Sequence, residues 1–480
     1  MTNQEQANRR FVSIAIVAFA AFLAVDAYLF ASDGFLRMFG AATQEGQVRS
    51  KVNRAERQAE IADVVLFGSS YVRSGLAGEP FLERGILPFN LAVSGGGPLL
   101  EYFALKRIAP VLQRRTVKPL LVLELKTDAL MRLRNSAWSE YPQYSAIVRS
   151  RSEMVQEWPR LWANFRDFKM TSQLLSGLVI PSGIYRSQAV PMLGARVSLD
   201  GYFYGTEDFS GFSPLYTTAV PAMVPGGPPQ PPLTFDKIWP GKIDFVRAFM
   251  ALARTTGCQV VLYESPTIML GRDSAMLNAL IDQLSAEFGD LRVIRTADVV
   301  REVGDFDEGG HLNIKGADET ARRLIASLGL SGDQAALARK LDLGFEKLAV
   351  PDMSQWVAPG ARATGLGADL TIQPVAEPSG LIAQSPPFKL NPPGEWVLEL
   401  AMPELTGRLS VEPSWVEDGV ERRMQYVTPV EAPRLGGSTR MFIRMSTTAD
   451  VTVKIFDYNL LTGGEPSAGR VRVLRLWKNR

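Results

Sequence analysis

The sequence predicts an α/β domain with a parallel sheet, followed by an all-β domain and preceded by an apolar helix. Between about residues 55 and 332, five short apolar runs alternate with amphipathic stretches, which indicates strands covered by helices on both faces. Residues 350–480 consist of short alternating segments separated by turn residues, which is typical of a β-sandwich or jelly roll. Residues 11–30 are almost uniformly apolar.

The apolar run at residues 11–30 is long enough for a helix that crosses a bilayer, which needs about 20 such residues. Arg9 and Arg10 precede it, and a positive flank tends to stay in the cytoplasm. We expect a single-pass anchor in a bacterial inner membrane, with the main body periplasmic. A cleaved signal peptide is the alternative, although no convincing cleavage site follows. Asp26 lies near the outer end, where its carboxylate can reach the interface.

The α/β pattern contains strands, helices and one long insertion. The predicted strands are Asp63–Phe67, Leu87–Val93, Leu120–Leu125, Gln259–Tyr263 and Leu291–Ile294. The predicted helices are Pro98–Arg115, Asp244–Thr255, Ser274–Phe288 and Ala317–Leu328, and Thr43–Glu60 is expected to be a polar, helix-prone connector. Residues 135–240 form the insertion, which is expected to be either a lid or binding loop or a packing excursion.

Composition excludes several classes of function. The 52 basic and 50 acidic residues leave a net charge of +2, without the basic patch of a nucleic-acid-binding protein. The one cysteine, Cys258, lies in an apolar run and is expected to be a core residue. A single histidine, His311, excludes a metal site built from several histidines.

Ser70 follows the first predicted strand in the segment Gly68-Ser69-Ser70. Open α/β sheets place their sites at the carboxyl ends of the strands, so a serine here is a candidate nucleophile. The backbone N–H groups of the same turn could stabilise an oxyanion. Taken alone, the segment is better explained as a helix N-cap.

Two further segments follow strands of the same sheet. The second predicted strand leads into Ser94-Gly95-Gly96-Gly97, where glycines allow a ligand to approach backbone N–H groups or simply make a tight turn. His311 lies just after the last predicted strand, in a polar loop that also contains Asp305, Asp307 and Glu308. An acid beside a histidine can orient the imidazole as a base for serine.

Taken in chain order, these segments resemble the SGNH/GDSL hydrolase superfamily, and Gly68-Ser69-Ser70 is similar to its teichoic-acid D-alanylation acyltransferase branch. The resemblance implies a flavodoxin-like, three-layer sheet, Ser70 as nucleophile and His311 as base. It implies Glu308 as the triad acid by spacing, with Asp307 as the second choice. Asn313 and Gly316 continue a pattern found in envelope members.

The resemblance also implies an oxyanion hole made by the N–H groups of Ser70 and Gly95, with Gly96 as the neighbouring option. The family commonly carries Gly-x-Asn-Asp after the third strand, whereas this chain has Lys126-Thr127-Asp128. Thr127 falls nearest the Asn position and could donate a hydroxyl hydrogen bond. Loss of one oxyanion donor typically costs about 10²–10³ in rate.

An anchored SGNH-like domain followed by a β-domain also resembles bacterial alginate and cellulose O-acetylation proteins. That resemblance implies an esterase or acyltransferase that acts on O-acyl groups, above all O-acetyl groups, of an exopolysaccharide. It needs no metal or dissociable cofactor, and a membrane protein could supply the acyl donor. Aromatic side chains of the β-domain would either stack on sugars or form its core, and we favour the core for most of them: Trp356, Trp396, Trp415 and Phe456.

Two other functions remain open from the sequence. A non-catalytic, membrane-tethered carbohydrate-binding or assembly factor on a decayed scaffold would explain the missing Asn. An esterase that acts on lipids would suit a membrane location, but no apolar acyl tunnel is evident. Whether water or a sugar hydroxyl receives the acyl group depends on water exclusion and acceptor positioning.

Overall fold

The computed structural model describes the α/β domain and most of the C-terminal domain. The described residues are 12–21, 24, 44–73, 75–93, 95–130, 156–157, 240–266, 274–289, 291–295, 305–306, 311–348, 352–358, 363–366, 369–374, 380–391, 394–402, 405–407, 409–417, 420–423, 426–427, 438–445, 448–461 and 465–479. Most of the insertion at 135–240 therefore lies outside the described residues, as do Asp307 and Glu308.

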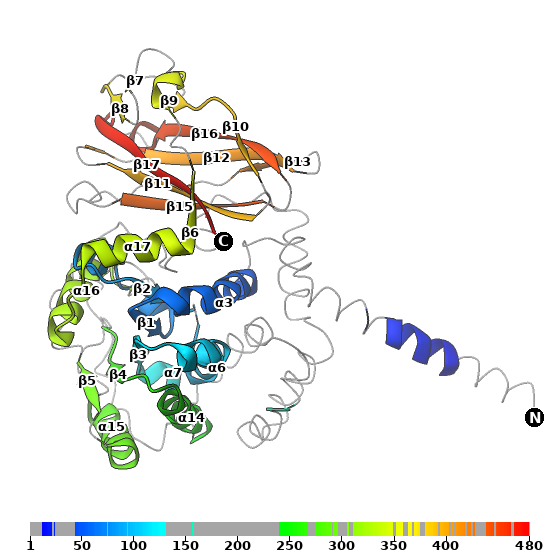
Figure 1. Ribbon diagram of the computed structural model, residues 1–480, viewed down its shortest axis with the longest axis vertical. Coiled ribbons are helices and arrows are strands. Elements are labelled where there is room, and N and C mark those ends of the chain that lie inside the picture. Colours follow the sequence, from blue (N-terminus) through cyan, green and yellow to red (C-terminus); the bar gives the residue numbers. More distant parts are fainter. Residues whose placement is uncertain are drawn as a thin grey trace, which may run out of the picture.

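All five strands predicted for the α/β domain are present in one parallel sheet, in the order β2-β1-β3-β4-β5 (Figure 1). Their bounds are β1 Val64–Phe67, β2 Pro88–Asn90, β3 Leu120–Glu124, β4 Val260–Tyr263 and β5 Arg292–Ile294. This is the flavodoxin-like order: β2 is added on one side of β1, and β3 and the later strands are added on the other side. Ligands of such sheets bind in the crevice outside the strand ends between β1 and β3.

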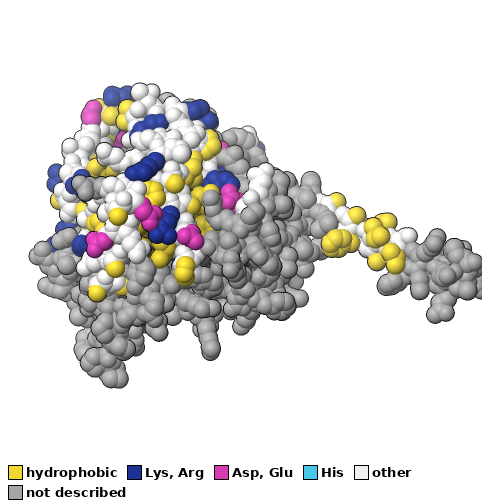
Figure 2. Space-filling model, turned by 90° about the horizontal axis from the view of Figure 1, so that it is seen from below, with side chains coloured by type: hydrophobic (Ala, Val, Ile, Leu, Met, Phe, Trp, Pro, Cys, Tyr) yellow, Lys and Arg dark blue, Asp and Glu magenta, His cyan; other side chains and the backbone are white. Residues whose placement is uncertain are grey.

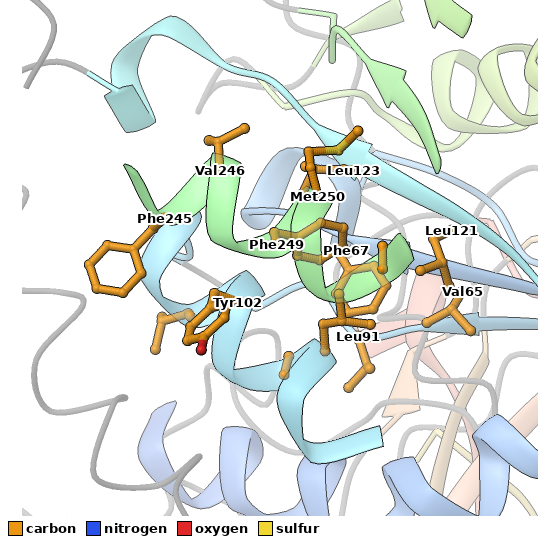
Figure 3. Close-up of a cluster of buried hydrophobic side chains, with 14 of the residues drawn as sticks. Val65, Phe67, Leu91, Tyr102, Leu121, Leu123, Phe245, Val246, Phe249 and Met250 are labelled. Atoms are coloured by element: carbon orange, nitrogen blue, oxygen red, sulfur yellow. The ribbon is translucent and has the colours of Figure 1, made fainter. Parts of the chain in front are cut away.

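Alternate strand residues supply two separate apolar cores, as expected for a three-layer domain. Val65 and Phe67 pack with one set of helices: α3 Gln44–Ile61, α6 Pro98–Arg114, α14 Pro240–Thr256 and α15 Ser274–Phe288. Figure 3 shows part of this core, where Phe249 meets Phe67 edge to face. Val64 and Leu66 face the other set: α4 Ser70–Arg73, α5 Glu79–Glu83 and α16 Ile314–Leu328. A short helix, α7 Thr127–Leu130, follows β3.

Several element boundaries differ from the predicted ones; α14, for example, begins at Pro240 and not at Asp244. Two of the differences arise because asparagine side chains bind nearby backbone. Strand β2 ends at Asn90, whose Oδ1 accepts the Ala92 N–H at 3.0 Å and whose Nδ2 donates to Val72 O at 3.1 Å. These bonds turn the chain away from the sheet earlier than the apolar pattern suggested. Helix α16 begins three residues before its predicted start because Asn313 caps it, with Oδ1 accepting the Gly316 N–H at 3.0 Å.

Helix α3 is more than the polar connector that its composition predicted. It packs along α6, and Val52, Ala55 and Ala59 on one of its faces belong to the domain core. Lys51, although charged, is 1% exposed and donates from Nζ to the Ala92 carbonyl oxygen at 2.6 Å. The helix therefore contacts the loop that follows β2.

The C-terminal domain contains two antiparallel six-stranded sheets, in line with the predicted all-β unit (Figure 1). Helix α17 Gln334–Gly344 leads directly into its first strand and contacts α3. One sheet contains β6 Phe345–Leu348, β7 Ala363–Leu366, β8 Asp369–Ile372, β11 Gly394–Ala401, β15 Ser438–Met445 and β17 Gly469–Asn479. The other contains β9 Leu381–Gln384, β10 Phe388–Leu390, β12 Leu409–Glu417, β13 Val420–Arg423, β14 Tyr426–Val427 and β16 Ala449–Asp457. Two short helices, η5 Met353–Gln355 and α18 Tyr458–Leu461, complete it.

The tryptophans of this domain are core residues. Trp396 is 1% exposed, and Trp356 and Trp415 are also buried in the same apolar cluster. Phe456 is half-buried. Sugar stacking on the three indole rings is therefore excluded in this conformation, and the packing interpretation holds for them.

The N-terminal apolar run is described only in part, as a helix over residues 12–21. Its large side chains are exposed, among them Val12, Ile14, Ile16, Val17 and Phe19. Figure 2 shows this helix as a run of apolar side chains. None of the helices in the described part of the chain combines the length and apolar character that a membrane crossing requires.

Candidate active site

The turn after β1 is held tightly against β3. A Cβ on Gly68 would lie 2.7 Å from the Glu124 Cβ, so no other residue fits here without movement. The Ser69 N–H donates to Glu124 Oε2 at 2.5 Å, and Ser69 Oγ accepts the Tyr71 N–H at 3.3 Å. Ser70 then begins α4 and is half-buried. The glutamate of β3 thus fixes the backbone that carries Ser70.

The segment around His311 is held at both ends. Phe306 and Leu312 form an isolated antiparallel bridge, and the Asn313 N–H donates to Asp305 O at 2.8 Å. Gly316 lies so close that a Cβ there would be 2.4 Å from the same Asp305 oxygen. The Asn313 and Gly316 pattern therefore has a structural reason, because it allows α16 to start against the loop and fixes His311 just before it.

These two supports bring His311 to Ser70. His311 Nε2 lies 2.9 Å from Ser70 Oγ, although 241 positions separate the residues in the chain. The distance is that of a hydrogen bond. If Nε2 accepts the serine proton, Nδ1 carries the other ring proton, which is the tautomer that a general base for serine requires.

An aromatic ring and two cations surround the imidazole. Tyr71 stacks on His311 with 4.6 Å between ring centroids and an interplanar angle of 29°. Lys126 Nζ lies 3.0 Å from the centroid of the Tyr71 ring. Burial first, then the charges of Lys126 and Arg73, lower the pKa of His311 from 6.5 to about 4. The imidazole is therefore neutral, and able to accept a proton, over most of the physiological pH range.

The end of β3 and the start of α7 carry buried polar atoms that lack partners among the described residues. They are Glu124 Oε1 and Thr127 Oγ1, with Thr127 only 1% exposed. Tyr263, which pairs with Glu124 in the sheet, has an unpartnered hydroxyl as well. Burial, and then the charges of Glu124 and Glu264, raise the pKa of Tyr263. Unsatisfied buried groups are costly, so their concentration at the carboxyl ends of β3 and β4 indicates a site where a ligand completes the hydrogen bonds.

The loop after β2 approaches the same turn. The Val93 N–H donates to Gly68 O at 3.0 Å, which ties the loop to the nucleophile turn. Gly95 is exposed and has a φ of 67°, a conformation that glycine adopts without strain. The Gly96 N–H donates to Val93 O at 2.9 Å, which argues against the option of Gly96 as an oxyanion donor.

The structure brings together Ser70 and His311 from the predicted set, and places Thr127 after the neighbouring strand at the same sheet edge. The choice between Glu308 and Asp307 falls outside the described residues. In the part of the chain that is described, no group of three or more His, Cys, Asp or Glu side chains could hold a metal ion.

Sequence reasoning missed four residues around the pair: Tyr71, Arg73, Glu124 and Lys126. Glu124 and Lys126 are charged residues at the end of an apolar strand, and charge there is unusual unless a site uses it. That signal was available in the segment Leu120–Lys126. Nothing in the sequence pattern indicates that Tyr71 stacks on His311, because the two come from opposite ends of the domain.

Comparisons with known proteins give only distant likenesses. No protein-family model matches the sequence, and no curated protein matches it. One similar solved structure is a two-domain esterase (CEX) active on acetylated mannans, co-crystallised with mannopentaose. It is 9% identical with a TM-score of 0.24, and the match covers 90% of this chain and 95% of that chain.

Two other solved structures are less similar. A cycloisomaltooligosaccharide glucanotransferase from Paenibacillus sp. is 8% identical with a TM-score of 0.17, over 49% of this chain and 47% of that chain. The capsular polysaccharide assembling protein CapF from Staphylococcus aureus is 8% identical with a TM-score of 0.14, over 87% of this chain and 96% of that chain. Scores and identities this low give no guide to activity.

Proposed function

We propose that this protein is a serine esterase or acyltransferase in which Ser70 is the nucleophile and His311 the general base. The observation that carries the proposal is the distance of 2.9 Å between Ser70 Oγ and His311 Nε2. A serine hydroxyl is a weak nucleophile until a base can take its proton. A neutral imidazole at hydrogen-bond distance, on the carboxyl edge of an α/β sheet, meets that need.

The reaction starts when Ser70 Oγ attacks the carbonyl carbon of an ester while its proton passes to His311 Nε2. The negative charge on the carbonyl oxygen is stabilised by the N–H groups of Ser70 and Gly95 and by the hydroxyl of Thr127. Collapse of this intermediate breaks the bond to the alcohol, which leaves with the proton from His311. Water or a sugar hydroxyl then attacks the acyl-serine and gives its proton to His311. Collapse of the second intermediate releases the carboxylic acid or the acylated sugar, and His311 returns the proton to Ser70 Oγ.

The third member of the site belongs to the loop before His311. Glu308, or Asp307 as the second choice, accepts a hydrogen bond from the Nδ1–H of His311. A carboxylate in that position holds the productive tautomer and stabilises the imidazolium formed during attack. This assignment rests on spacing in the sequence.

The substrate we propose is an O-acyl group, above all O-acetyl, on an exopolysaccharide. The support is the resemblance of the chain to envelope O-acetylation proteins, which also carry a β-domain after an anchored SGNH-like domain. The buried indoles of this β-domain exclude recognition of sugars by stacking on Trp356, Trp396 or Trp415. Any polysaccharide contact made by the β-domain must use other side chains.

We also propose that residues 11–30 anchor the protein in the inner membrane, with both folded domains on the periplasmic side. The support is the length of the apolar run and the Arg9-Arg10 pair before it. Extraction with alkaline carbonate should leave the full chain in the membrane fraction. Release of a shortened chain would instead indicate cleavage after the apolar run.

A fluorophosphonate probe and a p-nitrophenyl acetate assay test the catalytic proposal. The wild-type protein should label and hydrolyse the ester, and Ser70→Ala should lose labelling and at least about 10³-fold of kcat/KM. Ser331→Ala is the control for removal of a serine hydroxyl, because Ser331 is exposed and follows the end of α16 that is remote from His311. Folded wild-type protein that does not label would favour a non-catalytic carbohydrate-binding role.

A further inference from the structure

Three side chains from separate segments of the chain form a stack at the candidate site. His311 and Lys126 both contact the ring of Tyr71, with 4.6 Å between the two ring centroids and 3.0 Å from the ammonium nitrogen to the tyrosine centroid. An ammonium group that close fills the space over one face of the ring. The imidazole must therefore lie against the opposite face, and Tyr71 lies between the other two.

Tyr71 is suited to fix the orientation of the imidazole. It follows Ser70 directly in α4, so the nucleophile and the ring that supports the base belong to one helical turn. Contact along one face of the imidazole limits its tilt, while the hydrogen bond to Ser70 Oγ fixes its rotation. Such pre-organisation matters because small misplacements of catalytic groups can cost about 10²-fold in rate.

Lys126 adds a positive charge to the stack, which disfavours protonation of His311. It lies just after β3, is 8% exposed, and places its ammonium over the Tyr71 ring as a cation–π contact. The negative face of an aromatic ring alone would favour a protonated imidazole beside it. A cation on the far side of the same ring opposes that effect, and Arg73, buried in α4, adds a second positive charge.

We propose that Tyr71 and Lys126 are positioning residues, which hold the His311 imidazole against Ser70 and keep it ready to accept a proton in acidic surroundings. The inference rests on the proposed Ser70–His311 chemistry. Burial is the largest cause of the low pKa of His311, and the described charges that lower it further are Lys126, just after β3, and Arg73 in α4. Tyr71 supplies the ring contact. The loop that carries His311 also contains Asp307 and Glu308.

The first experiment uses the fact that the chain contains a single histidine. NMR of the full-length protein with ¹³C-labelled histidine reports the titration of His311 without any need for turnover. The wild-type pKa of His311 should be about 4, and Lys126→Met should raise it toward 6.5. Lys126→Arg keeps the charge and should leave the titration near that of wild type.

A distant lysine supplies the control for charge removal. Lys389 is exposed on β10, so Lys389→Met should not move the His311 titration. Where Lys126→Met does not fold, as judged by its melting temperature, Lys126→Gln replaces it. A wild-type His311 that titrates near 6.5, or one that titrates identically in wild type and Lys126→Met, overturns the inference.

The second experiment separates positioning from a general packing role. Tyr71→Leu should lower kcat for p-nitrophenyl acetate about 10-fold or more with little change in KM. Tyr71→Phe keeps the aromatic ring and should have a kcat near that of wild type. In Lys126→Met, activity should fall several-fold at pH 5 relative to pH 8, while wild type keeps most of its activity. Full kcat in Tyr71→Leu contradicts the positioning role.

Failure of the two proposals gives different results. If Ser70→Ala kept full activity, the proposed function would fail, yet the NMR titration would still decide whether Lys126 controls His311. If Ser70→Ala were inactive and Lys126→Met titrated like wild type, the esterase chemistry would stand and the inference about the stack would not.

Discussion

The carboxyl edge of the parallel sheet and the interior of the C-terminal sandwich both bury polar side chains, but they differ in how these are satisfied. In the sandwich, Asp457 is fully buried and its carboxylate accepts the N–H of Ser467 at 2.7 Å, the hydroxyl of Ser467 at 2.8 Å and the N–H of Leu460 at 3.1 Å. At the sheet edge, Glu124 is 4% exposed and only Oε2 has a described partner.

The difference indicates that the buried polar groups of the sandwich stabilise the fold, whereas those at the sheet edge are available to a ligand. A buried carboxylate with three donors stabilises the turn around it and has little acceptor capacity left for a ligand. A buried carboxylate oxygen and a buried hydroxyl that have no partner among the described residues, as at Glu124 and Thr127, cost stability that is recovered only when something binds. In the described part of the sandwich, the buried side-chain atoms without partners are instead indole N–H groups on large apolar rings, where burial of the ring outweighs the loss.

The largest expected effect belongs to the sandwich and should leave the chemistry untouched. Trp396→Ala removes a ring that is 1% exposed and should cost about 3–5 kcal/mol in the free energy of unfolding. The kcat for p-nitrophenyl acetate should stay near wild type at temperatures where the variant is folded. Urea unfolding and the ester assay measure the two quantities. A large loss of kcat in folded protein would show that the regions are not independent.

Thr127→Val should have the opposite effect to Trp396→Ala, with a loss of activity and no loss of stability. Valine keeps the shape of the side chain and removes a buried hydroxyl that has no described partner. Stability should be unchanged or raised, and kcat should fall about 10²-fold if the hydroxyl serves the oxyanion. Thermal melts and the ester assay test this, with Thr127→Ser as the variant expected to keep the donor. An unchanged kcat would remove Thr127 from the oxyanion hole.

The pKa of His311 gives the sheet edge a characteristic dependence on pH. The folded-state pKa of about 4 lies below the unfolded value of 6.5. Between these values the unfolded chain binds more protons, so stability should rise with pH across this window and gain no more above it. The difference amounts to up to about 3 kcal/mol. Urea unfolding at pH 4.5 and pH 7 should therefore show a larger difference for wild type than for His311→Asn, and equal differences would contradict the low pKa.

The smallest expected effects come from neutralising the two buried carboxylates, Asp457 in the sandwich and Glu124 at the sheet edge. Asp457→Asn should lower the free energy of unfolding by about 1–3 kcal/mol, because the amide nitrogen would face groups that already donate. Glu124→Gln should change stability less and lower kcat about 10-fold through displacement of the Ser69 backbone. The ester assay and urea unfolding of both variants make the comparison. If Asp457→Asn and Glu124→Gln lost the same free energy of unfolding and had the same kcat, the two carboxylates would not differ in role.

Periodicity was enough to predict the five parallel strands and four of the helices, since continuous apolar runs and helical spacing depend on local sequence alone. The meeting of Ser70 with His311 followed from the rule that parallel strands carry their sites at one edge. The stack of Lys126, Tyr71 and His311 could not be predicted in this way, because ring orientation depends on side-chain packing between elements far apart in the chain. The early end of β2 depended similarly on hydrogen bonds that Asn90 makes across the fold.

The pairing of β17 has a consequence for the order in which the chain can assemble. This strand bonds to β6, β8 and β11, so it lies inside its sheet although it comes last among the described strands. During synthesis, the parallel sheet and its helices can close while the sandwich still lacks an interior strand. Until residue 479 has left the ribosome, β6, β8 and β11 have unpaired edges, and the nascent domain must be kept from pairing them with another chain.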